Sequence, residues 1–358
     1  MARWPRASSR SRFKPPFFPP IIEPPFPDKL GLTIWSCRLR WWQRRSAPEA
    51  GFPVWNSPVD VVEYAGSLGS ASLQIGVDGW EPTLAREVRR RCDSIGMELE
   101  GQIELPGDLE RFERDLLAGK EAGASIFRCY GLLQRRYEHF PSRVAWEQWQ
   151  EAAIATLQRV EPILAKHQVR LAVENHKDWC AAEQAEVFRH LSSEWIGICL
   201  DYGNNMALLE DPLATAQTLA PWILTTHVKD MAVRQTPDGF LLSEVPLGRG
   251  ILDLSALTRI CREANPRVRF LLEMITRDPL PIPWLTDSYW ATFSADDRDF
   301  RRHRAQEWGL RSGATTSDLP HESLLTDAEA LRLEERFIRE SFRFWGSQEA
   351  PATTHHHS

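Results

Sequence analysis

Four short apolar runs in the second half of the chain each end in a residue that can bind a metal ion. The four terminal residues are Glu174, Asp201, His227 and Glu273. Helix-like stretches separate the runs, a pattern that is typical of buried parallel strands. In an eight-stranded β/α barrel the C-terminal ends of all strands meet at one mouth, so the four side chains are predicted to lie together.

Three carboxylates gathered at a barrel mouth need a cation, because a buried carboxylate without a partner is strongly destabilising. Taken singly, an acidic residue after a strand is more often a helix N-cap or a solvated loop residue. Four such residues in succession, each at a strand end, favour one divalent metal ion. Three oxygens and one nitrogen predict Mn²⁺ first, with Mg²⁺, Co²⁺, Zn²⁺ or Fe²⁺ as alternatives.

A six-coordinate metal with four protein ligands keeps two positions for a substrate. A carbonyl oxygen and the adjacent hydroxyl of a sugar can fill them. The metal then polarises the carbonyl and makes the neighbouring C–H acidic, because it stabilises the enediolate that forms when the proton leaves. A carboxylate beside the metal can accept that proton.

The elements that must position these residues follow along the chain. Earlier strands are predicted at 30–37, 71–75, 97–103 and 125–130, and helices at 58–68, 82–95, 108–122, 142–167, 181–191, 212–219 and 253–264. Thr326 and Glu329 have capping-box spacing and predict a last helix. The alternation predicts an α/β fold, a (β/α)8 TIM barrel with an N-terminal proline-rich arm and a C-terminal extension.

We divide the chain into three parts. Residues 1–29 form a basic, proline-rich arm, which we expect to be extended or disordered because proline disfavours core helices and strands. Residues 30–345 form a single barrel domain, in which 274–325 is predicted to be an irregular segment near the barrel mouth or at an interface. Residues 346–358 form a tail with a histidine-tag remnant, His355–His357, which we exclude from the metal site.

Composition narrows the function classes. A net charge of −6 argues against a general nucleic-acid surface, because phosphate binding needs clustered Lys and Arg. No apolar stretch approaches the length of a membrane span. The six cysteines form no CxxC pair, and the arm lacks the apolar run of a secretory signal, so we expect reduced thiols and a cytoplasmic protein.

The motifs resemble those of the xylose isomerase-like TIM barrel family, which includes sugar phosphate isomerase/epimerase-like proteins. The resemblance is carried by Val173–His176, Leu200–Asn204, His227–Asp230, Pro246–Gly250 with Asp253, and Leu272–Met274. It implies that Glu174, Asp201, His227 and Glu273 bind one divalent metal. The family residues that match Glu174 and Glu273 face opposite sides of the substrate in the epimerases and move protons there. Family members often associate, which makes a homodimer or tetramer an expectation.

Two further residues are predicted to be catalytic. His176 lies two positions past Glu174, on the same strand face by the period of two, and serves as an acid or base or, alternatively, orients a neighbour. Lys229 stabilises an enediolate oxygen or, alternatively, pairs with Asp230.

Polar residues near other strand ends are predicted to bind substrate. They are Arg128, Glu104, Gln102, Gln74, Arg249 and Arg277. Arg249 has an alternative place in a turn that precedes a helix capped by Asp253, and Arg277 has an alternative partner in Asp278. No strong phosphate-binding motif appears, which favours an unphosphorylated small-molecule sugar as the substrate.

Four functions remain open from the sequence. The first is a metal-dependent isomerase or epimerase of a sugar or keto-sugar. The second is a metal-dependent lyase, a dehydratase or β-eliminase, acting on a keto-sugar, keto-inositol or 3-oxo-glycoside. The third is the related endonuclease that cuts abasic DNA, which needs several zinc ions and additional histidines. The fourth is a binding protein without a metal.

Overall fold

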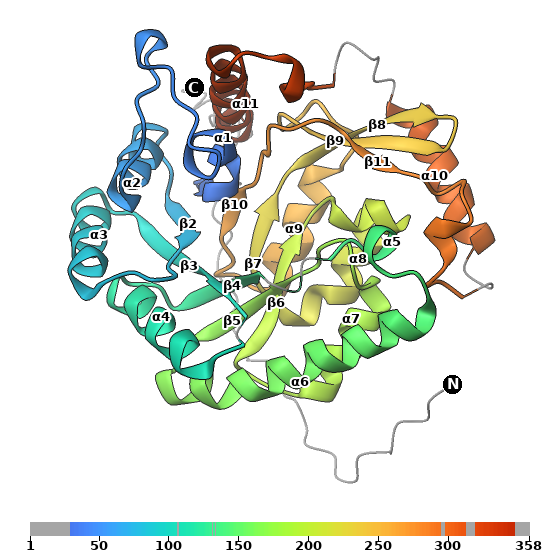
Figure 1. The fold of residues 1–358 in the computed structure, drawn as a ribbon, viewed down its shortest axis with the longest axis horizontal. Helices are drawn as coiled ribbons and strands as arrows, with labels where there is room; N and C mark the ends of the chain where they lie inside the picture. The colour runs from blue at the N-terminus through green and yellow to red at the C-terminus, as the bar shows by residue number, and fades with distance from the viewer. Residues whose placement is uncertain are drawn as a thin grey trace, which may run out of the picture.

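The computed structural model describes residues 29–105, 107–130, 132, 134–294, 298–312 and 319–347. Within them, eight parallel strands close a barrel in the order β1-β10-β7-β6-β5-β4-β3-β2 (Figure 1). The strands are β1 (Gly31–Thr33), β2 (Ser72–Gly76), β3 (Glu98–Glu104), β4 (Ile126–Tyr130), β5 (Arg170–Glu174), β6 (Ile196–Asp201), β7 (Ile223–Val228) and β10 (Phe270–Leu272). The predicted (β/α)8 fold is confirmed. The arm before residue 29 and the histidine-tag remnant lie outside the described residues.

Helices surround the barrel (Figure 1). They are α2 (Pro58–Ser67), α3 (Pro82–Ile95), α4 (Leu109–Glu121), α6 (Arg143–His167), α7 (Ala181–Leu191), α8 (Pro212–Leu219), α9 (Leu254–Ala264) and α11 (Asp327–Ser347). The predicted last helix is therefore present. Thr326 Oγ1 accepts the N–H of Glu329 at 3.4 Å, and the Glu329 carboxylate accepts the N–H of Thr326 at 2.9 Å, which is the predicted capping box.

The apolar core fills the space between the strands and the helices. Strand residues such as Leu73 and Ile75 belong to one hydrophobic cluster with helix residues such as Val88, Leu157 and Leu164, and all are buried. The hydrophobic effect from this burial holds the helices against the barrel. This packing fixes the ends of the strands, and it therefore also positions the polar side chains at those ends.

Insertions follow the C-terminal ends of three strands. After β1 come η1 (Ile34–Cys37), α1 (Arg38–Trp41) and η2 (Pro48–Ala50), and after β4 comes α5 (Arg136–His139). After β7, the strands β8 (Asp230–Thr236) and β9 (Gly239–Val245) form a hairpin, which β11 (Leu280–Ile282) extends into a three-stranded antiparallel sheet. All of these elements therefore lie at the end of the barrel where the predicted ligands lie.

The prediction that 274–325 is irregular is wrong in part. Besides β11, this segment contains η5 (Ser288–Trp290), α10 (Arg298–Ser312) and η8 (Glu322–Leu324). Aromatic and aliphatic side chains of the segment, including Tyr289 and Trp290, form a second hydrophobic cluster with Met231 and Phe240 of the hairpin. The segment therefore folds because the hairpin, which the sequence analysis did not predict, supplies apolar partners for its side chains.

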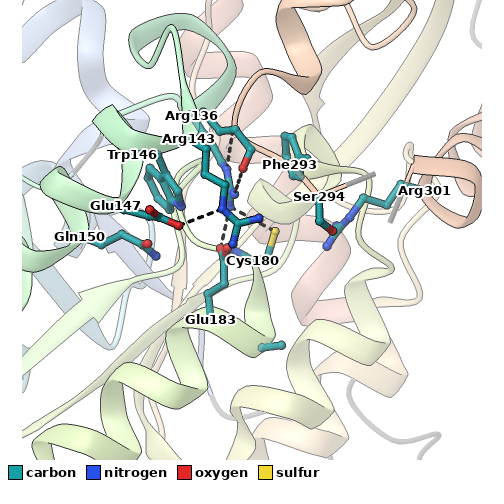
Figure 2. A pocket seen from close by; sticks show the side chains of 12 residues that line it. Arg136, Arg143, Trp146, Glu147, Gln150, Cys180, Glu183, Phe293, Ser294 and Arg301 are labelled. Carbon is teal, nitrogen blue, oxygen red and sulfur yellow. Dashed lines mark hydrogen bonds and ion pairs between the residues drawn. The ribbon is translucent and has the colours of Figure 1, made fainter. Parts of the chain in front are cut away.

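A cavity of about 240 Å³ lies where this segment meets α5, α6 and α7 (Figure 2). Buried Arg136 donates to Thr292 Oγ1 at 2.8 Å and to Glu183 Oε2 at 2.6 Å. Its guanidinium also lies 4.3 Å from the ring centroids of Trp146 and Phe293. Arg136 therefore fastens the C-terminal segment to α6 and α7.

The helices and the cysteines can be compared with the expectations from the sequence. None of the helices in the described ranges combines the length and the apolar character needed to cross a membrane. All six cysteines are buried and carry free thiols.

Candidate metal centre

The four predicted metal ligands lie together at one end of the barrel. Glu174 and Asp201 end β5 and β6, His227 is the next-to-last residue of β7, and Glu273 directly follows β10. One ligand atom from each residue lies within 4.8 Å of the others, and all four side chains are buried. The parallel strands thus convert four separate sequence positions into one cluster.

Gln74 of β2 fixes the ring of His227. The amide Nε2 of Gln74 donates to Glu100 Oε2 at 3.0 Å, which leaves its Oε1 facing His227 Nε2 at 2.8 Å. Because a carboxylate only accepts, the amide of Gln74 can take no other orientation, and His227 Nε2 must carry a proton. In the neutral ring the lone pair is then on Nδ1, which faces the glutamates of the cluster.

The ammonium of Lys229 lies among the carboxylates. Its Nζ is 2.6 Å from Asp201 Oδ2, 2.5 Å from Glu273 Oε2 and 3.9 Å from Glu244 Oε1. Burial raises the pKa of Asp201 to about 6 in spite of this neighbour. Burial opposes ionisation of Glu273 as well, but Lys229 and His227 hold the pKa of Glu273 well below its ordinary value. Lys229 therefore pairs with two of the predicted ligands rather than with Asp230.

The turn Pro246–Gly250 wraps around a carboxylate of the protein itself. Asp230 Oδ2 accepts the backbone N–H of Gly248 at 3.0 Å and of Gly250 at 2.8 Å. A Cβ at Gly250 would lie 2.0 Å from Asp230 Oδ1, so this close approach requires glycine. Asp253 caps α9, as predicted. These contacts match the predicted turn-and-cap arrangement.

Glu174 is held by two neighbours. Arg128 of β4 donates to Glu174 Oε2 through Nε at 2.8 Å and also through Nη2, and Asn204 Nδ2 donates to Glu174 Oε1 at 2.7 Å. Burial would raise the pKa of Glu174, but Arg128 keeps it below its ordinary value. Arg128 is buried, and its Nη1 has no hydrogen-bond partner among the described residues. This predicted substrate-binding residue thus lies beside a ligand with one donor unused.

Arg277 reaches the cluster through Glu244 of β9. Its Nη2 and Nε lie 2.5 and 3.1 Å from the two carboxylate oxygens of Glu244, which is itself buried. Glu244 in turn faces Lys229. The predicted alternative partner of Arg277, Asp278, instead accepts the backbone N–H of Ser323 at 3.0 Å. That alternative is wrong.

His176 and Lys177 lie in the loop after β5. The strand ends at Glu174, so the period of two no longer determines where His176 points. Burial, with Lys177 and Arg128 nearby, lowers the pKa of His176 well below its ordinary value, so the imidazole is neutral. Lys177 is buried, and its Nζ donates to Asn204 Oδ1 at 2.5 Å. Asn204 therefore connects Lys177 with Glu174.

The other three predicted substrate contacts are placed differently. Gln102 is buried and donates to Gln74 Oε1 at 2.9 Å, so it reaches the cluster only through Gln74. Glu104 is exposed, with Arg111 3.8 Å away. Arg249 is exposed as well and lies 3.0 Å from Glu340 of α11. The contacts of Glu104 and Arg249 give no support to a substrate role.

Sequence reasoning missed three polar residues of this site: Lys177, Asn204 and Glu244. Lys177 and Asn204 lie inside or next to the motifs that carried the resemblance, but no spacing rule distinguishes them from loop residues. Glu244 lies on the unpredicted hairpin. The sequence Pro237-Asp238-Gly239 between two alternating runs is a turn signal that predicts such a hairpin.

The residues fit a divalent cation. His227 Nδ1 lies 3.1 Å from Glu273 Oε1 and 3.6 Å from Glu174 Oε2, and it has no hydrogen-bond partner in the described part of the chain. Burial opposes a charge on His227, but Glu273 and Glu174 raise its pKa above the ordinary value, so the ring favours a positive charge at Nδ1. A divalent cation between Nδ1 and the carboxylates can supply that charge in place of the proton, with the neutral imidazole as a ligand. Across the described ranges, this is the one cluster of side chains arranged to hold a metal ion. It gives no support to a multi-zinc endonuclease.

Relatives and structural neighbours give the family context. A 3-oxo-isoapionate decarboxylase from Pectobacterium atrosepticum is 26% identical over 220 residues, which cover 60% of this chain and 76% of that enzyme. A D-psicose 3-epimerase superposes with a TM-score of 0.52 at 13% identity, covering 88% of this chain and 99% of that one. The IOLI protein, solved with a zinc atom, superposes with a TM-score of 0.50 at 13% identity, covering 80% and 100%.

The structural similarities establish the fold, and the sequence establishes the family. The model of the xylose isomerase-like TIM barrel family matches residues 62–291, more than half of the chain. The match includes every predicted metal ligand and the strands that carry them. This chain therefore belongs to the xylose isomerase-like TIM barrel family.

Proposed function

We propose that the protein is a divalent-metal-dependent isomerase or epimerase of a sugar or keto-sugar. The observation that supports this most is the order of the ligands around the barrel. Neighbouring strands β10, β7, β6 and β5 carry Glu273, His227, Asp201 and Glu174 in that order. The two glutamates thus lie at the two ends of the ligand arc, where one can take a proton from a substrate and the other can return it.

The other residues have roles that follow from their contacts. A bound divalent cation, Mn²⁺ as first choice, supplies electrophilic stabilisation of an enediolate. Lys229, which lies against Asp201 and Glu273, can neutralise charge on a substrate oxygen nearby. Neutral His176 can accept or donate a proton, and Arg128 orients Glu174 while offering Nη1 to a hydroxyl.

Deuterium exchange tests the proposal on any carbonyl compound that the site accepts. The metal-loaded protein is incubated in D₂O with a panel of ketoses and keto-sugar acids, and each is analysed by NMR and mass spectrometry. We expect deuterium next to the carbonyl of at least one member, and an exchange rate about 10²–10⁴-fold lower in Glu273→Gln. Equal exchange in Glu273→Gln would contradict the role of that carboxylate.

A lyase is the second candidate, and the decarboxylase relative favours it. In a β-keto acid the C–C bond to the carboxylate breaks, CO₂ leaves, and the electron pair passes into the adjacent carbonyl as an enolate, which then takes one proton. The same stabilised anion thus arises by loss of CO₂ instead of a proton, while a dehydratase would expel a β-hydroxyl from it. Release of CO₂ with one deuterium in the product identifies decarboxylation, and exchange with retained carbon identifies epimerisation or isomerisation.

A further inference from the structure

Lys177 is a buried cation that lacks a counter-ion in the part of the chain that the structure describes. Its side chain is 2% exposed, and the contact made by Nζ is to a neutral amide oxygen, Asn204 Oδ1, at 2.5 Å. The adjacent carboxylate of Asp178 accepts the backbone N–H of Trp179 at 2.7 Å instead of pairing with Lys177. An ammonium has three donors, so burying it on one amide is costly unless an anion arrives.

The charges around the predicted metal ligands also favour an anionic ligand. Contacts link four cationic side chains with four carboxylates in one network: Arg128, Lys177, Lys229 and Arg277 with Glu174, Asp201, Glu244 and Glu273. With the imidazole of His227 neutral, as a metal ligand must be, the charges of these side chains sum to zero before the charge of the metal is added. A divalent cation adds two positive charges to a buried site, which then favours a negatively charged ligand.

We propose that the substrate is a sugar acid and that Lys177 binds its carboxylate. The inference rests on the proposed function for the divalent metal, and it holds for epimerisation as well as for decarboxylation, since a keto-sugar acid can undergo either. Lys177 approaches from the loop after β5, next to the metal ligand Glu174. A ligand whose keto group faces the metal can therefore place a carboxylate within reach of Lys177.

The test compares two probes that differ only in the anion. 5-Keto-D-gluconate carries a carboxylate where L-sorbose carries a hydroxymethyl group. Binding of each to the Mn²⁺-loaded protein is measured by calorimetry for the wild type, for Lys177→Gln and for Lys166→Gln. Lys166 is an exposed lysine of α6 that pairs with Glu113 and serves as the matched control.

We expect the wild type and Lys166→Gln to bind the keto acid about tenfold or more tightly than the ketose. In Lys177→Gln the preference should fall below about threefold, with binding of L-sorbose retained and a melting temperature no lower than that of the wild type. Equal binding of the two probes to the wild type, no measurable binding of the keto acid, or an undiminished preference in Lys177→Gln each overturns the proposal.

Two further arms separate the alternatives. If D-fructose 6-phosphate, rather than the keto acid, gains affinity that depends on Lys177, the anion is a phosphate and the carboxylate assignment is wrong. Metal content is measured on the same samples. A wild type that retains no metal contradicts the proposed function, and the preference for the keto acid is then judged on the metal-free protein by the same threshold.

Discussion

At the scale of single residues, the candidate metal centre depends on a side chain that is not one of the four predicted ligands. Gln74 holds the Nε2 proton of His227, and Glu100 holds Gln74. Thr225 and Arg269 also donate to Glu100, each at 3.0 Å. Glu100, the last member of this series of hydrogen bonds, is therefore held in place by the barrel. Such outer partners commonly contribute to metal affinity because they fix the tautomer and direction of the imidazole.

Gln74→Leu should therefore weaken metal binding about 10–100-fold while the barrel stays folded. Without the amide acceptor, His227 is free to place its proton on Nδ1 and lose the lone pair that faces the glutamates. Competition with a fluorescent chelator measures the affinity, and circular dichroism checks the fold. Gln217→Leu, a change on the exposed face of α8, is the control. Unchanged affinity in Gln74→Leu would show that the ligands alone orient the ring.

His176 offers a second residue-scale prediction. Its neutral imidazole has an Nδ1 without a hydrogen-bond partner in the described ranges, which suits a group that meets the substrate. His176→Asn should keep the metal and reduce deuterium exchange about 10²-fold. The exposed His303 supplies the matched control, His303→Asn. Loss of metal would place His176 among the ligands, and unchanged exchange would remove it from catalysis.

At the scale of elements, α11 is anchored to α1 by a buried carboxyl group. Glu334 Oε2 accepts the backbone N–H of Leu39 at 2.8 Å, and the side chain is 2% exposed. Burial raises the pKa of Glu334 from 4.5 to about 8, although Leu39 and Arg40 oppose the rise. The folded state therefore binds one more proton than the unfolded state between these two values.

This difference predicts the sign of a pH dependence. The contribution of Glu334 to stability is fully present below pH 4.5 and is lost as the pH rises toward about 8. Relative to Glu334→Gln, the free energy of unfolding of the wild type should fall by at most about 1.4 kcal/mol per pH unit in that window. Urea unfolding at pH 5, 6, 7 and 8 measures the difference. A difference that stays flat from pH 5 to pH 8 would mean that Glu334 is ionised in the fold.

Arg136 makes a comparable anchor for the C-terminal segment (Figure 2). Arg136→Met should lower the free energy of unfolding by about 2–4 kcal/mol, because Thr292 loses its donor and two rings lose the cation. Arg143 lines the same cavity but is 60% exposed and pairs with Glu147. Arg143→Met should therefore change stability by less than about 0.5 kcal/mol. Similar losses in both variants, by denaturant unfolding, would contradict the anchoring role.

The sequence could predict the ligand arc because strand and ligand adjoin. An apolar run sets the strand, the strand sets the direction, and the next residue must emerge at the mouth, as for Glu174 and Asp201. The same reasoning fails for residues that lie farther along the loops after the strands. Arg249 also follows a strand. The carboxylate of Asp230, however, accepts backbone N–H groups of the turn that contains Arg249, and the Arg249 side chain pairs with Glu340 on α11. Loop directions depend on such tertiary hydrogen bonds, which no local pattern contains.

At the scale of the whole molecule, the insertions and the charge distribution serve the same end of the barrel. The hairpin β8–β9 brings Glu244, and the segment after β10 brings Arg277, so both insertions add charge to the network around the ligands. Buried charges cost stability unless they are balanced. Lys229 supplies that balance for Asp201 and Glu273, so a metal ion that binds to these carboxylates must compete with an internal cation.

Metal binding should nevertheless stabilise the fold, because the unfolded chain has no preformed site. At a free Mn²⁺ concentration 100 times the dissociation constant, linkage gives about 2.7 kcal/mol, or a rise of a few degrees in melting temperature. EDTA should reverse the rise, and Asp201→Asn should abolish it. Asp211→Asn, at the N-cap of α8, retains a good cap and should keep the full shift. If wild type and Asp201→Asn respond equally to metal, the ion binds elsewhere, and Lys229 and Arg128 balance the carboxylates at the barrel mouth.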